Sequence, residues 1–285
     1  MSEAPSLPNR QAILVDRAFT VLAWLLGATG IALPGVIIGF LAVRGLGVID
    51  WAFLTSPPGG FPLGQAGGIG PALQGSLALV GIGLVVALPL AVGGALFLTE
   101  YNRFPALARI VRFATECLAA IPSIVYGLFG YAILVVFMSL KISLLAGGIT
   151  LGLVMFPLIL IGAQEALEAV SWQDREAALS LGVTRAYVVR RVVLRQAAPG
   201  ILAITTLAAG HAFGSAAPVL FTASVIFSRG GLGLETPVMT LPTHLYFLVG
   251  EALSFEHAYG TALVLVGVLL IVNVLVVCLK GALRR

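Results

Sequence analysis

Three polar side chains lie within apolar stretches of the chain, where their hydrogen-bonding groups could serve an anion. His211 and Ser215 are four residues apart in a run that begins near Gly200, so a helix would place them on one face, near the middle of the run. Ser123 follows Pro122, which removes a backbone hydrogen bond and kinks a helix. Imidazole and hydroxyl groups donate hydrogen bonds without fixed charge, so they can pass an anion without retaining it. A bond from His211 to a neighbouring helix is the equal alternative.

A second candidate site lies in the longest charged stretch, residues 175–191. Residues 173–181 contain strong helix formers, Gly182 stops that helix, and Thr184 is a suitable N-cap for another. The sequence therefore predicts two short helices joined by a glycine turn.

The first of these helices carries Glu176, Ala177 and Ala178, which would give it a low, flat face. Such a face can enter a groove on another protein. The alternative is an amphipathic hairpin that lies on the lipid surface, with its arginines against anionic headgroups.

The composition identifies the class of protein that must position these residues. Of the 285 residues, 59% are hydrophobic and only 10% are charged, whereas a soluble domain carries about 25% charged residues. The sequence therefore predicts an all-α integral membrane protein with one domain over residues 1–285. The basic residues are explained by their places beside membrane spans, so no nucleic-acid partner is implied.

Six runs reach the length of about 20 apolar residues that a membrane-spanning helix needs. They are 18–43, 71–98, 113–138, 144–163, 200–226 and 259–279. The first run exceeds the apolar region of a signal peptide, about 7–15 residues, so we expect it to be a retained helix. Pro157 is expected to kink the fourth run as Pro122 kinks the third.

The positive charges predict which side each connection occupies. All but Arg44, Lys141 and Arg229 of the 16 lysines and arginines fall at the termini or in the connections after the second and fourth runs. Positive residues are retained on the cytoplasmic side. The termini and the connection 164–199 are therefore predicted to be cytoplasmic, and Cys117 and Cys278, near cytoplasmic ends, to be reduced thiols.

The charged connection has the residue order of a known motif. Residues 176–178, followed after three residues by Gly182 and later by Leu194, resemble the EAA loop of ABC importer membrane subunits, and the distance from the C-terminus is also similar. The family pattern closes with Leu-Pro, whereas Arg195 follows Leu194 here and a proline comes only at Pro199. In that family the loop forms a coupling helix that fits a cleft of a cytoplasmic ATPase, which implies this role for residues 164–199.

Two further stretches resemble the phosphate importer permeases, in particular the PstA-type subunit: "AAIPSIVYGLFGYAI" at 119–133 and "GSAAPVLFTA" at 214–223. The related permeases carry an arginine and a glutamate where this chain has His211 and Ser215. Either a partner permease supplies the charged path, or the transported anion differs, or the pump is impaired. Gly210 and Gly214 could bring a partner helix close, and packing within the subunit is equally compatible with their spacing.

The resemblance implies a type I ABC importer permease fold with six transmembrane helices and both termini cytoplasmic, in the bacterial inner membrane. It implies a non-catalytic subunit that binds no cofactor directly, with ATP and Mg on a PstB-type ATPase dimer. The other implied partners are a PstC-type sister permease, a PstS-type extracytoplasmic phosphate-binding protein and membrane lipid. Consistent with this, the sequence has no Gly-x-x-x-x-Gly-Lys-Ser/Thr motif and no cluster of metal ligands, and His244 and His257 are expected to be solvated loop residues.

Three alternatives remain at this point. The first is an ABC permease for molybdate, a sulfur oxyanion or an amino acid. The second is an ion-driven secondary transporter, which predicts carboxylates at mid-span; Glu116, near one end of the third run, comes closest. The third is a structural membrane protein, which would leave the EAA-like loop unexplained.

Overall fold

The computed structural model describes residues 10–61, 66–228 and 231–283, and most of these residues are helical. Within these ranges, five helices are long and apolar enough to cross a membrane, or six when one sharply bent pair counts as a single span. The predicted class, an all-α membrane protein, is confirmed.

The described elements follow one another along the chain, with the longest connection, residues 223–240, between the last two short helices. They are α1 (Arg10–Gly45), the 3-10 helix η1 (Leu46–Val48), α2 (Trp51–Thr55), β1 (Pro58–Gly59), β2 (Ala66–Gly67), α3 (Gly70–Leu96), the π-helix η2 (Phe97–Tyr101), α4 (Pro105–Ala120), α5 (Ser123–Gly130), the π-helix η3 (Tyr131–Phe137), α6 (Leu144–Glu168), α7 (Trp172–Ser180), α8 (Arg185–Val188), the π-helix η4 (Val189–Val193), α9 (Leu194–Phe213), α10 (Ala217–Thr222), α11 (Leu241–Gly250) and α12 (Phe255–Leu283).

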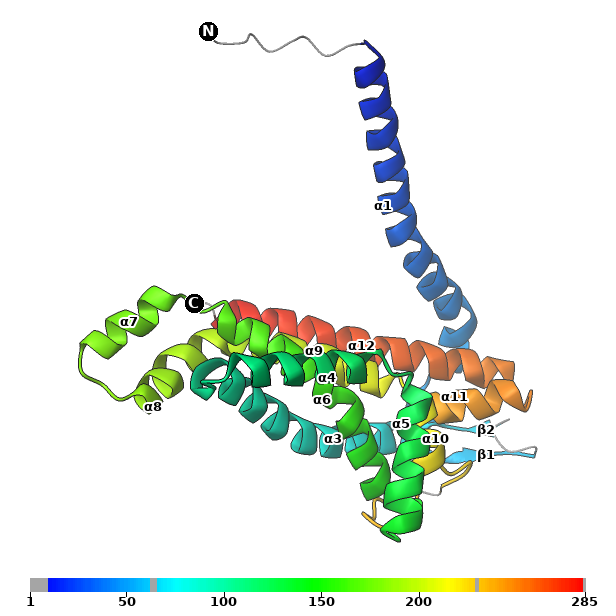
Figure 1. The fold of residues 1–285 in the computed structure, drawn as a ribbon. Helices are drawn as coiled ribbons and strands as arrows, with labels where there is room; N and C mark the ends of the chain where they lie inside the picture. Colours follow the sequence, from blue (N-terminus) through cyan, green and yellow to red (C-terminus); the bar gives the residue numbers. More distant parts are fainter. Residues whose placement is uncertain (1–9, 62–65, 229–230, 284–285) are drawn as a thin grey trace.

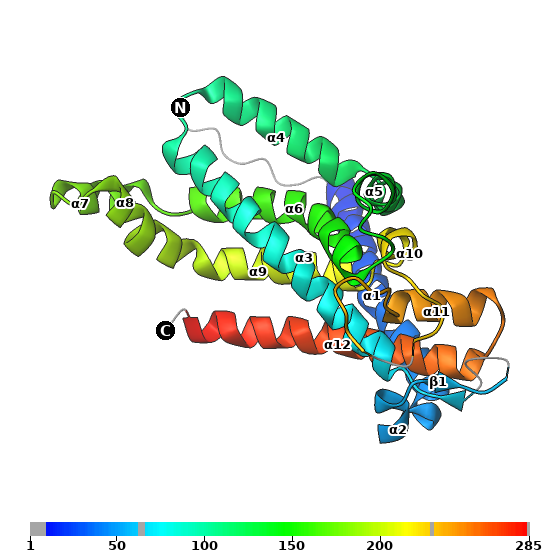
Figure 2. The same cartoon turned by 90° about the horizontal axis from the view of Figure 1, so that it is seen from below.

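The centre of the molecule is a bundle of α3, α6, α9 and α12 (Figures 1 and 2). α3 packs most extensively on α6, and small buried residues recur every four positions on this face of α3: Gly83, Ala87, Ala91 and Ala95. A Cβ added at Gly83 would lie 3.1 Å from the backbone nitrogen of Gly152 on α6. Small residues allow this close approach, which membrane helices need because lipid offers them no hydrophobic drive to associate.

The two ends of the bundle differ. α7 and α8 lie at one end, together with the C-terminal end of α12, whereas α11 and the β1–β2 hairpin lie at the other (Figure 1). At the latter end, the first amides of α6 are satisfied by a later segment: Leu144 donates to the carbonyl of Thr236 and Leu145 to that of Leu234, each at 2.9 Å. The amide of Leu241 donates to Ser76 Oγ at 2.8 Å. Residues 234–241 thus tie α3 and α6 together away from α7.

Helix α1 lies apart from the bundle (Figure 1). It packs mainly on α12, where the rings of Phe40 and Tyr259 meet edge to face with centroids 5.6 Å apart. A Cβ added at Gly45 would come within 2.7 Å of the Tyr259 carbonyl oxygen. The contact of α1 with the rest of the chain is therefore concentrated near its C-terminal end.

The third predicted span, 113–138, is a broken pair of helices rather than one kinked helix. α4 and α5 meet at a bend of 97° around Pro122. Because Pro122 has no N–H, it cannot donate to the Leu118 carbonyl. The hydroxyl of Tyr126 donates to that carbonyl instead, at 2.8 Å. The Leu118 carbonyl also accepts from the amide of Ile121 at 3.1 Å, so it has two partners despite the missing proline donor.

The fifth predicted span, 200–226, also differs from the structure. The apolar helix runs from Arg185 to Phe213 and then stops, and α10 begins only at Ala217. Apolar residues lie on both sides of this break, so the sequence shows one continuous apolar run where the structure has two helices. Pro157, by contrast, lies within α6 without ending it. Since α6 extends to Glu168, the connection that contains α7 and α8 begins after this residue and not at residue 164.

The prediction that His244 and His257 are solvated loop residues is wrong. His244 lies in α11 and is only 6% exposed. His257 is half-buried in the first turn of α12, where its Nδ1 atom lies 3.1 Å from Ser254 Oγ. Burial and the nearby His257 lower the pKa of His244 to about 4.

Candidate functional site

The connection after α6 folds as helix, turn and helix, as the sequence predicted. Ser171 caps α7 by accepting a hydrogen bond from the amide of Gln173 at 3.2 Å. Gly182 follows the helix with φ +75°, a conformation that glycine adopts without the steric penalty of a Cβ. Thr184 Oγ1 then accepts from the amide of Tyr187 at 3.4 Å and caps α8. The turn therefore has its shape because of its own residues.

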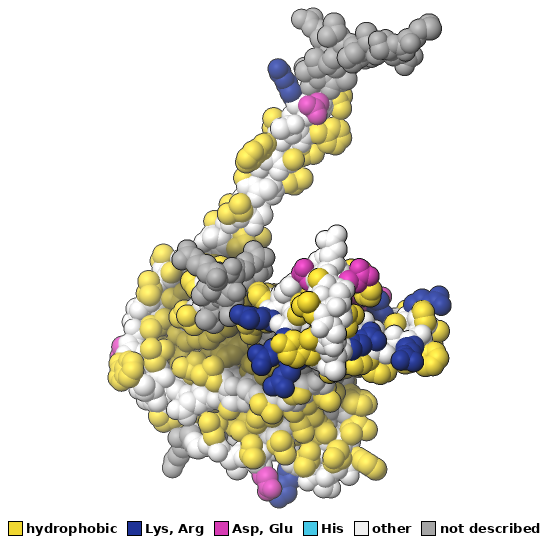
Figure 3. Space-filling model, turned by 90° about the vertical axis from the view of Figure 1, so that its left-hand side faces the viewer, with side chains coloured by type: hydrophobic (Ala, Val, Ile, Leu, Met, Phe, Trp, Pro, Cys, Tyr) yellow, Lys and Arg dark blue, Asp and Glu magenta, His cyan; other side chains and the backbone are white. Residues whose placement is uncertain are grey.

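The predicted docking residues divide into two groups. Glu176 and Ala177 are exposed on α7, whereas Ala178 is half-buried against the main core cluster. Leu181, at the tip of the turn, is 82% exposed. Ala178 is therefore a support for α7 rather than part of its free face. Lys and Arg side chains gather at this end of the molecule (Figure 3), and exposed members of the set are Arg185, Arg190, Arg191 and Arg195.

A buried ion pair lies beneath α7, and the residue pattern of the sequence did not predict it. Arg175, directly before the Glu176 motif, contacts Glu100 in η2, with Arg175 Nη2 2.9 Å and Nε 3.2 Å from Glu100 Oε1. One signal could have pointed to the carboxylate, because Glu100 is the first charge after the long apolar run of α3. Nothing in the spacing could have paired it with an arginine 75 positions away.

A cavity of about 500 Å³ lies among α4, α5, α6 and α9. Two predicted pathway residues, Ser123 and His211, line it together with Pro122 and Pro157. The remaining lining residues are Leu118, Ala119, Ile121, Tyr126, Val154, Leu158 and Leu207. The break between α4 and α5 therefore carries Ser123 to the same space as His211 from α9.

The polar groups of this cavity are few. Within the described part of the chain, the side chains of Ser123 and His211 form no hydrogen bond, whereas the Tyr126 hydroxyl is engaged with Leu118. No carboxylate or arginine is among the lining residues. The cavity thus offers a hydroxyl and an imidazole on otherwise apolar walls, an arrangement that can hydrogen-bond an acceptor without a strong ionic contact.

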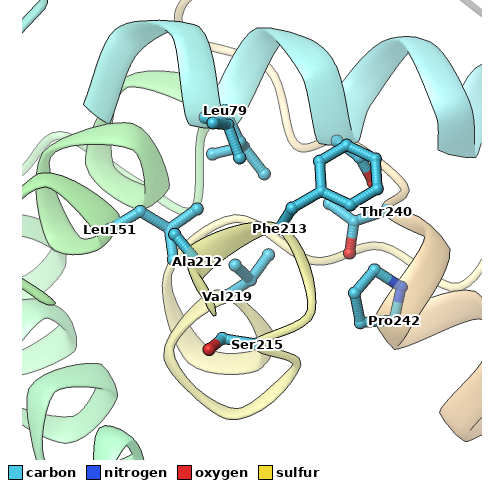
Figure 4. A pocket seen from close by; sticks show the side chains of 10 residues that line it. Leu79, Leu151, Ala212, Phe213, Ser215, Val219, Thr240 and Pro242 are labelled. Atoms are coloured by element: carbon cyan, nitrogen blue, oxygen red, sulfur yellow. The ribbon is translucent and has the colours of Figure 1, made fainter. Parts of the chain in front are cut away.

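Ser215 is not brought into this cavity. It follows the end of α9, and its hydroxyl donates to the His211 carbonyl oxygen at 2.9 Å, so it closes the last turn of the helix. Its side chain borders a separate pocket of about 10 Å³, on the side opposite Leu79 (Figure 4). His211 accordingly lies near the end of α9 and not at the middle of a span. Gly210 faces Leu269 of α12, 3.6 Å from an added Cβ, and so packs within the subunit.

Comparison with known proteins agrees with this architecture. The family described as binding-protein-dependent transport system inner membrane component matches residues 83–285. The phosphate transport system permease protein PstA of Yersinia pestis is 30% identical over 269 residues, which cover 94% of this chain and 88% of the relative. The probable ABC transporter permease protein YqgI of Bacillus subtilis is 28% identical over 245 residues, covering 82% and 83%. A chain of a bacterial ABC transporter involved in the import of the acidic polysaccharide alginate has the same fold, with a TM-score of 0.63 and 14% identity over 97% of this chain and 100% of its own.

The family match covers most of the chain, including the cavity-lining helices and α7. It confirms the predictions of an ABC importer permease fold, a non-catalytic subunit and a multi-pass inner-membrane location. Permeases of this kind act together with an ATPase and a binding protein. This chain belongs to the family of binding-protein-dependent transport system inner membrane components.

Proposed function

We propose that the chain is the membrane-spanning permease subunit of an ATP-driven phosphate importer. The observation that carries the proposal is the 30% identity to a PstA permease over nearly the whole chain. The cavity supports it, because Ser123 and His211 offer free hydrogen-bond donors and no lining carboxylate repels an anion. Phosphate oxygens accept hydrogen bonds, so the two donors suit this substrate.

In this proposal, partner proteins form the other parts of the transporter. A PstC-type sister permease completes the path and supplies charged groups that this chain lacks beside His211. A PstB-type ATPase dimer binds ATP and Mg, and this chain binds no cofactor directly. A PstS-type binding protein delivers phosphate to the end of the molecule opposite α7. Ser215 takes the role of holding the last turn of α9, which carries His211.

Helix α7 is the proposed ATPase-docking element. Its exposed residues Glu176 and Ala177, with Leu181 at the turn, form the face that enters a groove of the ATPase. Ala178 supports this face from below, and Gly182 shapes the turn. A lipid-surface hairpin is less compatible with Glu176, since anionic headgroups repel an exposed carboxylate.

Uptake by the reconstituted complex tests the substrate assignment. Proteoliposomes with both permeases, the ATPase and the binding protein should accumulate radiolabelled phosphate, and excess sulfate, molybdate or amino acids should not compete. The double variant Ser123→Ala with His211→Ala should lower uptake about tenfold, because each lost hydrogen bond contributes about 0.5–1.5 kcal/mol. Thr206→Ala is the matched control, since its hydroxyl is exposed on α9 and already donates to Leu202.

The competition experiment and the double variant test different parts of the proposal. Competition by another solute would reassign the substrate, and wild-type uptake in the double variant would remove Ser123 and His211 from the path.

The docking role of α7 has its own test. Ala177→Asp should reduce the amount of ATPase that copurifies with the permease, because an unpaired carboxylate would enter a desolvated contact. Ala106→Asp, at an exposed alanine near the start of α4, is its control.

A further inference from the structure

Helix α7 is held to the membrane bundle in an unusual way. Of its nine residues, the buried one is a charged side chain, Arg175, which is 9% exposed. Its carboxylate partner, Glu100, is 7% exposed. An amphipathic helix normally rests on apolar residues. The attachment of α7 therefore depends on directional polar contacts more than on packing.

Arg175 contacts η2, the end of α6 and the connection that follows α6. Besides Glu100 in η2, its guanidinium donates to the carbonyl of Leu167 at 2.7 Å and to the carbonyl of Val170. Leu167 lies in the last turn of α6 and Val170 just beyond it. The terminal carbonyls of a helix lack intrahelical partners, and a cation is favourable beside them. Arg175 thus closes the end of α6 while it binds the end of α3 through Glu100.

The geometry fixes the position of α7 more strictly than an apolar contact could. Guanidinium hydrogen bonds require both distance and direction, so a slide or rotation of α7 would break several of them together. A cavity of about 240 Å³, lined by Glu100, Arg175 and Val189 among others, separates parts of α7 from η4. Close packing is therefore incomplete here, which leaves the polar contacts to hold the helix.

A second contact joins the same two regions. The guanidinium carbon of Arg185, at the start of α8, lies 5.7 Å from the centroid of the Tyr101 ring. Tyr101 follows Glu100 in η2. The helices before and after the Gly182 turn are therefore both fastened to the end of α3, at adjacent residues.

We propose that Glu100 and Arg175 are positioning residues for energy coupling: they join α7 rigidly to α3 and α6, so that a displacement of α7 by the ATPase moves both helices together. The proposal rests on the proposed role of α7 in docking. α6 supplies Val154, Pro157 and Leu158 to the large cavity. Because α3 packs along α6, a displacement at Arg175 reaches that wall through a continuous pair of helices.

Variants of the pair test this in the reconstituted complex. Arg175→Met keeps an unbranched side chain, although a shorter one, and removes the charge and all of the guanidinium hydrogen bonds. Glu100→Gln keeps the shape of the Glu100 side chain and removes only its charge. Arg175→Lys keeps the charge but lacks the planar fork. The measured quantity is phosphate uptake per ATP hydrolysed, and we expect it to fall about tenfold or more in Arg175→Met, within the usual range of coupling effects. Lysine should rescue it only partly, because it cannot make the same set of bonds.

The matched control is the exposed pair Arg112 and Glu116 on α4, with a distance of 3.1 Å from Nε to Oε1. Arg112→Met and Glu116→Gln should leave uptake per ATP unchanged. A purely structural role for Arg175 predicts less assembled complex with an unchanged ratio. Uptake per ATP within about twofold of wild type in both Arg175→Met and Glu100→Gln, well below the usual coupling range, would overturn the proposal. If Arg175→Met does not assemble, Glu100→Gln alone decides.

A second measurement does not depend on the substrate. Amide hydrogen exchange of the full complex is compared without nucleotide and after trapping with ATP and vanadate. In wild type, residues 97–101 should change their exchange together with α7, whereas in Glu100→Gln only α7 should change. An equal change in the amide exchange of residues 97–101 in both proteins would contradict the proposed rigid connection of α7 to α3 through Glu100 and Arg175. Lack of phosphate uptake by wild type, with this exchange pattern present, would refute only the substrate assignment.

Discussion

Two arginine–glutamate pairs in this chain have similar separations and opposite surroundings. Arg112 and Glu116 lie one turn apart on α4, and their side chains are 54% and 53% exposed. Arg175 and Glu100 join distant segments, and their side chains are 11% and 9% exposed. Water screens the first pair, so it contributes little. The second has lost its hydration and depends on its partners, so removal of either leaves a buried charge unsatisfied.

The largest expected effect separates these two pairs directly. Arg175→Met should lower the free energy of unfolding of the purified permease by about 3–5 kcal/mol, because Glu100 would stay buried without a partner. Arg112→Met should lower it by about 0.2–1 kcal/mol. Titration with sodium dodecyl sulfate, followed by circular dichroism, measures both. Equal losses would show that burial does not distinguish the pairs.

A pair of glycines extends the comparison from charge to backbone. Gly182 has φ +75°, so Gly182→Ala should destabilise the turn by about 1–2 kcal/mol, the penalty of a Cβ in the left-handed region. Gly267 lies within α12 with open space around an added Cβ, so Gly267→Ala should be neutral or stabilising by up to about 1 kcal/mol. Detergent unfolding with hydrogen exchange of α7 compares them. A neutral Gly182→Ala would contradict a strained site.

A pair of histidines provides the comparison with the smallest expected effect on stability, and this effect depends on pH. The pKa of His244 is about 4, below the usual value of about 6.5, so the unfolded chain binds the extra proton between these values. The stability associated with neutral His244 is thus complete above pH 6.5 and is lost as the pH falls towards 4. Between pH 7.5 and 5.5 the loss should be about 1 kcal/mol.

His244→Gln should remove this pH dependence, whereas the exposed His211 gives a matched control, His211→Gln, that should retain it. Thermal unfolding followed by tryptophan fluorescence at the two pH values provides the measurement. An unchanged slope in His244→Gln would assign the pH dependence to other groups.

These contrasts also explain which features the sequence could predict. The helix–turn–helix of the connection after α6 depends on Ser171, Gly182 and Thr184, whose effects are local, so residue type and spacing were sufficient. The membrane class likewise depends on composition. The inward position of Ala178 depends on which side of α7 meets the bundle, and that is decided by Arg175, a long-range contact.

Broken helices were harder to predict for a related reason. A proline such as Pro122 indicates only that one backbone hydrogen bond is absent, and the same is true of Pro157. Whether the chain bends by 97° or continues depends on the groups that replace the missing bond, here the Tyr126 hydroxyl and the Ile121 amide. The end of α9 was concealed because apolar residues continue beyond Gly214. Ser123 and His211 line the same cavity because of the first break, so their common position could not be derived without it.

The contact between α1 and α12 has a consequence for biogenesis. Phe40 and Tyr259 belong to the first and last described helices, so their contact cannot form before α12 has been synthesised. The α3–α6 pair, much closer in sequence, can associate while the chain is still growing. Membrane insertion of α1 and its docking on α12 are therefore separate events in time, and until α12 has been synthesised α1 lacks its main contact within the described part of this chain.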